Sequence, residues 1–298
     1  RKMFYTRDYG NDTGKWVAFI PSGSPSPNYG GRFYSDLNDK TFTEKLDLSI
    51  PLAFLKGKHN AKVGAMFQQR DRNFNARVLG YSIAYTSQFN YDLLYYGQDT
   101  IFDKKNISEE GFLINEITNG SDKYNGENNL NSFYLMFDNT LFDNKLRVIW
   151  GFRNERFKQD LKSKDYGGKD LTVARDENDF MPSVNLVYSV TDDMNVRFAA
   201  SKTVARPEFR ELAPFSFYDF TIASSVQGND SLVRTKIYNY DIRWELYPGN
   251  NQLISVSTFY KKFQSPIEQV FYSSGNRQYT FQNVEAAENF GVEFEVRY

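Results

Sequence analysis

Residues 145–155 read KLRVIWGFRNE and residues 183–190 read SVNLVYSV, and these two stretches decide the fold class. In each, apolar and polar side chains alternate, so that Trp150 lies on one face of an extended chain and Arg153 on the other. Because successive side chains of a strand point to opposite faces, a period of two predicts β-strands. The polar faces carry full charges in mid-strand, and the strands extend to about ten residues or more, longer than those of a soluble sandwich. Such strands suit a tilted crossing of a bilayer, with one face to lipid and one to water.

The same alternation recurs along the chain and predicts roughly nine strands in one main ladder, each with a single apolar face. Further apolar stripes begin at Leu46, Ala61, Phe133, Val196, Tyr240, Ile254 and Val292. If lipid is the apolar phase that these stripes meet, we expect Trp150, Phe198, Ile242 and Val256 to point outward from a barrel.

The connections alternate between short and long. Four turn-rich links lie at 56–59, 142–145, 191–194 and 248–251, and long polar links lie at about 73–129, 159–179, 206–236 and 265–283. Gly, Pro, Asn and Asp tolerate the backbone angles of tight reversals. Long structureless links are unusual in compact domains, whereas short periplasmic turns and long extracellular loops are typical of outer-membrane barrels. The sequence therefore predicts an all-β chain forming part of an antiparallel transmembrane β-barrel, with the short turns at one rim and the long loops at the other.

Composition agrees with this fold and narrows the functions. Aromatic residues make up 17% of the chain, with 21 Tyr and 27 Phe, and such rings suit either an apolar core or a bilayer interface. No run of about 18 apolar residues exists, which excludes helical membrane spans. The absence of cysteine excludes disulfides and thiolate chemistry. A net charge of −1 gives no reason to expect a nucleic-acid partner.

Residues 201–215, SKTVARPEFRELAPF, resemble the barrel domain of TonB-dependent receptors, particularly the Bacteroidota type. Similar stretches are FMPSVNLVYS at 180–189, MNVR at 194–197, GNDSL at 228–232, NYDIR at 239–243, FYKKF at 259–263 and PIE at 266–268. The resemblance is dense over about 145–298 and looser over 41–72, where KHNAKVG at 58–64 fits it. In residues 1–40 and 73–129 we recognise no motif of a known family.

This resemblance implies a barrel of about 22 strands, filled by an N-terminal plug, in the bacterial outer membrane. It implies a transporter rather than an enzyme, which imports a scarce ligand (a siderophore, glycan, peptide or cofactor) and needs no bound cofactor of its own. The implied partners are outer-membrane lipid, an inner-membrane energy-coupling protein acting through the plug, and a surface lipoprotein in some receptors. Residues 1–298 contain no plug, no energy-coupling box and no signal peptide, and nine strands is an odd count. We therefore expect them to be an internal segment of one longer barrel domain.

Two loops are candidates for ligand binding. The first places Phe217, Tyr218, Asp219 and Phe220 just beyond a strand end, where Pro207 should stop ladder pairing. Exposed rings beside a carboxylate suit stacking against sugars, aromatic siderophores or peptides. The alternative is that the rings pack the loop onto itself. The second candidate is Tyr95 and Tyr96 in the longest link, with the same alternative.

Charged residues on the polar strand faces are expected to face the barrel lumen: Arg153, Glu155, Arg197, Arg243 and Glu245. They would pair with one another or with a plug, or line a substrate path. The single histidine, His59, lies in a predicted turn, and we expect it to be exposed to solvent rather than catalytic. Residues 8–14 fit a calcium loop poorly, because the acidic spacing differs and the final glutamate is missing. No catalytic residue and no metal site is predicted.

Two other classes of protein share parts of this pattern. A passive porin or adhesin barrel would show the same alternation and loop asymmetry but would carry no plug before residue 1. A soluble secreted carbohydrate-binding β-sandwich would bury its apolar stripes between two sheets.

Overall fold

The computed structural model describes residues 3–7, 14–26, 29–53, 57–85, 87–219, 222, 224–249, 251–274 and 276–298. Nearly all regular structure in them is β-strand. The elements in chain order are β1 (Tyr5–Arg7), β2 (Trp16–Ala18), β3 (Arg32–Pro51), β4 (His59–Ile83), the 3-10 helices η1 (Tyr91–Tyr95) and η2 (Lys104–Asn106), β5 (Phe112–Glu116), the 3-10 helix η3 (Gly120–Asp122), β6 (Lys123–Leu141), β7 (Leu146–Lys164), β8 (Asp170–Thr191), β9 (Met194–Ala205), α1 (Phe209–Leu212), β10 (Ser216–Asp219), β11 (Ser224–Gln227), β12 (Thr235–Leu246), β13 (Leu253–Gln264), β14 (Ile267–Ser274), β15 (Asn276–Asn283) and β16 (Ala286–Arg297).

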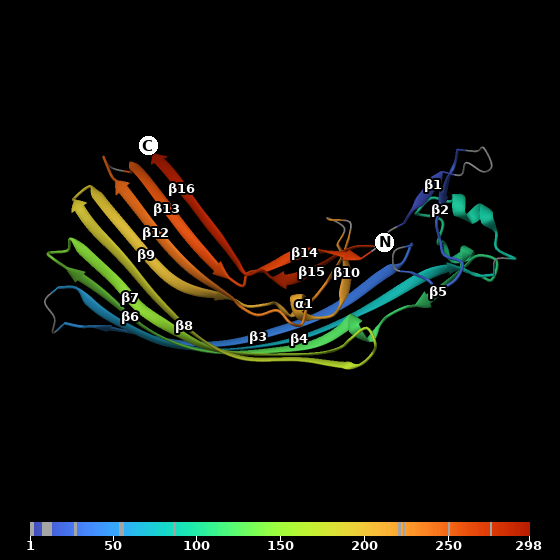
Figure 1. Ribbon diagram of the computed structural model, residues 1–298, viewed down its shortest axis with the longest axis horizontal. Coiled ribbons are helices and arrows are strands. Elements are labelled where there is room, and N and C mark those ends of the chain that lie inside the picture. Colours follow the sequence, from blue (N-terminus) through green and yellow to red (C-terminus); the bar gives the residue numbers. More distant parts are fainter. Residues whose placement is uncertain are drawn as a thin grey trace. The chain divides into compact units, whose positions relative to one another are not determined.

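In the described residues the main sheet has nine strands on its continuous path, in the order β16-β13-β12-β9-β8-β7-β6-β4-β3, and β5 pairs with β4 off that path. The number of strands on the path agrees with the sequence-based prediction. Figure 1 shows seven of these strands lying side by side: β6, β7, β8, β9, β12, β13 and β16. Short links join β3 to β4, β6 to β7, β8 to β9 and β12 to β13, and each joins two neighbours in the sheet. There are two smaller sheets in the described residues. One pairs β1 with β2, and the other has four strands in the order β10-β11-β15-β14.

The register aligns the apolar faces of neighbouring strands. Ile242 on β12 pairs with Phe198 on β9 on one side and with Thr258 on β13 on the other. Val256 on β13 pairs in turn with Phe294 on β16. Because the side chains of directly paired residues lie on the same face, these apolar stripes form one continuous surface across the strands. One face of the sheet is therefore apolar over several neighbouring strands.

The chain forms two compact units, which are described separately. Unit 1 comprises Arg1–Asn38, Asn73–Tyr124 and Lys164–Lys169, and unit 2 comprises Asp39–Arg72, Asn125–Ser163 and Asp170–Tyr298. Strands β3 and β4 contribute residues to both units, whereas β8, β9 and β12 to β16 belong to unit 2 alone.

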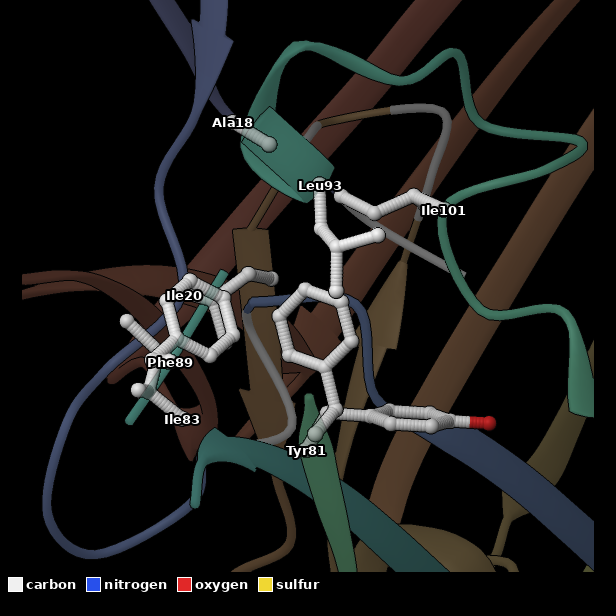
Figure 2. Packing of buried hydrophobic residues seen from close by; sticks show 8 residues of the cluster. Ala18, Ile20, Tyr81, Ile83, Phe89, Leu93 and Ile101 are labelled. Atoms are coloured by element: carbon white, nitrogen blue, oxygen red, sulfur yellow. The ribbon is translucent and has the colours of Figure 1, made fainter. Parts of the chain in front are cut away.

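Unit 1 has a hydrophobic core of its own. Its buried members come from β2, β4, β5, η1 and the links between them: Ala18, Ile20, Tyr81, Ile83, Phe89, Leu93, Ile101 and Phe112. Figure 2 shows these side chains converging from strand, loop and 3-10 helix. The predicted long link at 73–129 is therefore a folded element. Its first residues continue β4, its last ones start β6, and the residues between them pack around this core.

The prediction of a long loop at 159–179 is wrong. Strand β7 continues to Lys164 and β8 resumes at Asp170, so that only five residues connect them. Alternation persists through this region, but the apolar residues change face. On β7 they occupy even positions up to Phe152 and odd positions from Phe157 to Leu161, where they become buried. A sequence pattern that requires apolar residues at every second position throughout a strand therefore ends β7 too early.

The links at 206–236 and 265–283 are also structured. The first contains α1, β10 and β11, and the second is the hairpin of β14 and β15. These strands form the four-stranded sheet, in which β11 pairs in parallel with β15 and thereby ties the two links together. These strands were not predicted, because the links are polar and their apolar residues do not form one long alternating stripe.

Candidate functional site

The apolar face of the main sheet is open to its surroundings. Trp150 is 48% exposed and Ile242 51% exposed, and Val256 is also exposed, although all three are large apolar side chains in mid-strand. Phe198 lies on the same face and is half-buried. A β-sandwich would cover these stripes with a second sheet, which the exposures contradict. An exposed apolar face of this extent needs an apolar environment.

On β7 and β8 the apolar face ends at a sharp chemical boundary. The rings of Phe152 and Phe180 meet with centroids 5.1 Å apart. Two residues further along each strand, the amide of Asn154 donates to Asn178 Oδ1 at 2.9 Å. After two more residues comes an ion pair between Arg156 and Asp176, with a closest N–O distance of 2.8 Å. Aromatic, amide and ionic pairs in this order are expected where a strand leaves a hydrocarbon layer for water.

The opposite face of the sheet carries paired charges. Arg197 Nε on β9 contacts the carboxylate of Glu245 on β12 at 2.7 Å. Arg243 contacts the same Glu245 at 2.8 Å and Glu295 on β16 at 2.9 Å. Glu245 is thus held by two arginines, and this face is a ladder of ion pairs across β9, β12 and β16.

A second group of charges is more deeply buried and was only partly predicted. It forms a chain of alternating sign: Arg153, Glu155, Arg206, Asp179, Arg234 and Glu177. We call these six residues the buried ion network. Successive closest N–O distances are 2.5, 2.8, 3.0, 2.7 and 2.7 Å. The side chain of Asp179 is only 1% exposed, and its two oxygens accept from Arg206 and Arg234.

The buried ion network fixes the chain between β9 and β12 to the wall formed by β7 and β8. Arg206, just after β9, also lies with its guanidinium carbon 4.6 Å from the centre of the Phe157 ring. The carbonyl of the next residue, Pro207, accepts a hydrogen bond from the buried side chain of Gln159 at 3.0 Å. Sequence reasoning assigned Arg153 and Glu155 to the polar face but missed the other four. The sequence offered one signal for Arg206: Arg206 and Pro207 lie within residues 201–215, which carry the family resemblance.

Helix α1 continues this attachment. Its first residue, Phe209, is fully buried against β6 at Gly126, where an added Cβ atom would lie 2.6 Å from the ring. Arg70 and Arg72 of β4 approach the same ring at 5.9 and 5.7 Å, within the range of cation–π attraction. Glycine at 126 is therefore required by packing, because any side chain there would displace the ring.

The predicted aromatic loop folds partly onto itself. Phe217 on β10 lies under Arg210, whose guanidinium carbon is 3.0 Å from the ring centre, and it stacks near the buried Phe215. Asp219 ends β10 and pairs in register with Ser224. The backbone of Tyr218 lies in the same strand, while Phe220 lies outside the described residues, as do residues 8–13 of the weak calcium-loop match.

The other predicted residues divide between exposed and buried positions. Tyr95 ends η1 and is half-buried, whereas Tyr96, the next residue, is exposed. The prediction of an exposed His59 is wrong, because the residue begins β4 and is 9% exposed. Its Nδ1 lies 2.9 Å from the amide nitrogen of Asn139, whose oxygen accepts from the indole of Trp150. The histidine is thus a packed member of a polar cluster across three strands.

No metal centre is found in the part of the chain that the structure describes: no three His, Cys, Asp or Glu side chains there lie close enough to hold an ion. Among the same residues, none of the helices combines the length and apolar character that a membrane crossing requires.

Comparison with known proteins identifies the family. Residues 3–298 match the family described as TonB dependent receptor-like, beta-barrel. No curated protein matches the sequence significantly. Similar solved structures include the ferric-catecholate import receptor Fiu from E. coli K12, with 14% identity over 88% of this chain and 36% of that one, at a TM-score of 0.55. FpvA of P. aeruginosa, solved with heterologous pyoverdines, shows 16% identity over 99% of this chain and 33% of that one, at a TM-score of 0.55. The ferric yersiniabactin uptake receptor FyuA from Yersinia pestis shows 14% identity over 94% of this chain and 35% of that one, at a TM-score of 0.51.

At these identities the structures establish the fold, and the chain spans about a third of the length of each of these three receptors. The predicted fold class, an antiparallel transmembrane β-barrel wall, is confirmed, as is the predicted location in the outer membrane. With one apolar face, one charged face and a family match over almost all of its residues, the chain belongs to the β-barrel domain family of the TonB-dependent receptors.

Proposed function

We propose that this chain is part of the wall of an outer-membrane transporter that imports a scarce ligand with energy supplied through TonB. The observation that carries the proposal is the two-faced sheet. Its apolar face is exposed and in register across neighbouring strands, and its other face carries ion pairs such as that of Arg197 with Glu245. Such a wall separates lipid from an aqueous lumen, which is the structural requirement of a transport barrel.

The remaining parts of the proposal concern the whole protein. Residues 1–298 would belong to a single, larger barrel domain, completed by further strands and filled by a plug on which the energy-coupling protein acts. The short turns would lie in the periplasm, and the links at 73–129 and 206–236 would lie outside the cell. The Bacteroidota type and a partner lipoprotein are further proposals, which rest on the resemblance of residues 201–215 alone.

The ligand class is open among siderophores, glycans, peptides and cofactors. The similar solved structures include receptors for ferric catecholate and ferric yersiniabactin, FpvA bound to pyoverdines, a hemophore receptor with its hemophore and heme, and FpvAI in complex with pyocin S2. A transporter of this kind would not be an enzyme. Tyr95, Tyr96, Phe217, Tyr218, Asp219 and Phe220 stay candidates for ligand contact. Of these, Phe217 is the weakest, because Arg210 covers its ring.

Uptake measurements test the proposal. Cells carrying the intact receptor would be supplied with radiolabelled ferric citrate, a ferric catecholate or maltohexaose, with and without a functional TonB. We expect uptake of one probe to require both the receptor and TonB. Uptake that needs the receptor but persists without TonB would identify a passive porin instead, and protease cleavage at 142–145 in unbroken cells would reverse the assigned orientation.

A further inference from the structure

Unit 1 contains an open groove that the sequence did not indicate. Its volume is about 580 Å³, and it lies between the start of β3 and the link that joins η1 to η2. Six residues that line it matter here: Arg32, Phe33, Tyr34, Asp99, Phe102 and Asp103. All of them belong to the same compact unit, so the groove is a feature of unit 1 itself.

The floor of the groove is rigid. The ring of Phe102 stacks on Tyr81 with centroids 3.9 Å apart and meets the fully buried Phe112 at 5.2 Å. Gly30 lies against the same ring, where an added Cβ atom would come within 2.6 Å of it. The buried amide of Asn106 donates to the carbonyls of Thr100 and Ile101, each at 3.0 Å, which fixes the link that carries the two carboxylates. A preformed floor lowers the ordering cost of binding.

One aromatic side chain of the wall, Tyr34, lies beside Arg32 and is 50% exposed, although unit 1 buries other large apolar side chains in its core. The side chain of Phe33 points to the other face of β3, because successive side chains of a strand alternate. Other exposed rings of unit 1 include Trp16, Tyr85 and Tyr91. Half-exposed rings beside convergent polar groups are typical of ligand sites, where the face of a flat ring covers apolar C–H surface of the ligand.

The polar groups of the groove are of mixed kind. Arg32 supplies donors and reaches the Tyr34 hydroxyl at 3.3 Å, while Asp99 and Asp103 supply acceptors and Gln98 supplies both. A sugar hydroxyl both donates and accepts, so it can use all of these groups, whereas a cation could use the carboxylates alone. Two carboxylates against one guanidinium leave a net negative charge, which disfavours anions such as ferric citrate.

We propose that this groove is a binding subsite for an uncharged, polyhydroxylated ligand, a glycan. The ring of Tyr34, on the same face of β3 as Arg32, covers a sugar face, and Asp99, Asp103 and Arg32 bind its hydroxyls. This inference rests on the proposed transport function, since it assigns a ligand class to a receptor exposed at the cell surface. The subsite lies wholly within unit 1.

Calorimetry on the intact receptor in detergent tests the inference. The probes are maltohexaose, xylohexaose and mannohexaose, with ferric citrate and pentalysine as comparators. We expect one of the hexaoses to bind and Tyr34→Ala to weaken it by about tenfold, a loss typical of a single aromatic contact. Asp99→Asn should weaken it severalfold, and Tyr34→Phe, which keeps the ring, should lose less than Tyr34→Ala. The matched controls are Tyr85→Ala and Glu109→Gln, exposed residues of unit 1 outside the groove, and both should bind as the unmodified receptor does.

Three outcomes overturn the inference: no hexaose binds, a hexaose binds equally to all variants, or only pentalysine or ferric citrate responds to the groove variants. Hydrogen-exchange protection of the Ile101 amide shows that each variant keeps the fold of unit 1. The uptake assay separates this inference from the proposed function. If a probe is taken up in a TonB-dependent way and the groove variants do not change its uptake, the proposed transport function is supported and the glycan subsite is ruled out.

Discussion

The core of unit 1 and the main sheet of unit 2 place large apolar side chains differently. Unit 1 buries Ile101 and Phe112 completely, in a core assembled from strands and connecting segments. Unit 2 exposes apolar side chains such as Ile242 and Trp150 along its sheet and buries charged ones, including Glu155 and Asp179. A protein in water does the first, and a barrel wall with lipid outside and water inside does the second. One chain of 298 residues is thus built for two solvents.

The contrast is sharpest for Phe112. Phe112→Ala should destabilise unit 1 by about 3–5 kcal/mol, because it removes a fully buried ring and leaves a cavity. Limited proteolysis of the intact receptor should then cut the link at 84–111, while the barrel keeps its heat resistance on gels. The exposed Tyr85→Ala change should stay within about 0.5 kcal/mol. Equal loss of both units would show that they do not unfold separately.

The opposite rule should hold in unit 2. Ile242→Arg should destabilise the barrel by about 2–4 kcal/mol, because it places a charge on the lipid face near mid-strand. The control is Asp241→Arg, one residue earlier and on the other face, which should cost about 0.5 kcal/mol or less. Urea titration of the receptor in lipid vesicles measures both. If Asp241→Arg proves the more damaging, the two faces have been assigned the wrong way round.

The buried charges of unit 2 should matter more than exposed ones on the same strand. Asp179→Ala removes an acceptor from both Arg206 and Arg234 and should cost about 1–3 kcal/mol, since Glu155 and Glu177 still hold the two arginines. Asp176→Ala breaks the exposed pair with Arg156 and should cost about 0–1 kcal/mol. The same titration compares them, and equal effects would mean that the buried ion network contributes nothing beyond a surface pair.

The smallest effects should come from two carboxylates in unit 1. Hydrogen bonds from Arg77 and Thr118 lower the pKa of Glu116 from 4.5 to about 2, so its contribution is complete above pH 4.5 and is lost as the pH falls through about 2. Burial raises the pKa of Asp122 above its usual 3.8, so protonating it stabilises the fold as the pH falls through the raised value. The stability of unit 1 should therefore pass through a shallow maximum on the acid side of neutrality.

Differential scanning calorimetry of the intact receptor at a series of pH values measures this maximum. Glu116→Gln should remove the decline at low pH, and Asp122→Asn should remove the rise that precedes it. A profile that keeps both limbs in the double variant would assign the pH dependence to other groups.

The sheet was predictable wherever one periodicity held. The apolar stripes around Ile242 and Val256 predicted the strands, the turns between them and the polar face. They could do so because each position there meets the same solvent as the positions two residues away. Unit 1 was not predictable, since a core such as that around Phe112 joins segments distant in sequence and leaves no periodic mark. For the same reason Asp179 and Arg234 were missed, because their pairing depends on register across strands. The resemblance of residues 201–215 supplied the family but not these contacts.

The change of face between Phe152 and Phe157 has a consequence for how this wall can vary in length. Inserting one residue there would swap the outward and inward sets of every side chain beyond it, which would turn Phe157 and Leu161 outward and Arg156 inward. Inserting two residues would keep each side chain on its side and only lengthen the strand. The hairpin of β7 and β8 should therefore accept changes of length in even steps, matched on both strands. The height of the wall above the bilayer is then adjustable, but only in units of a residue pair.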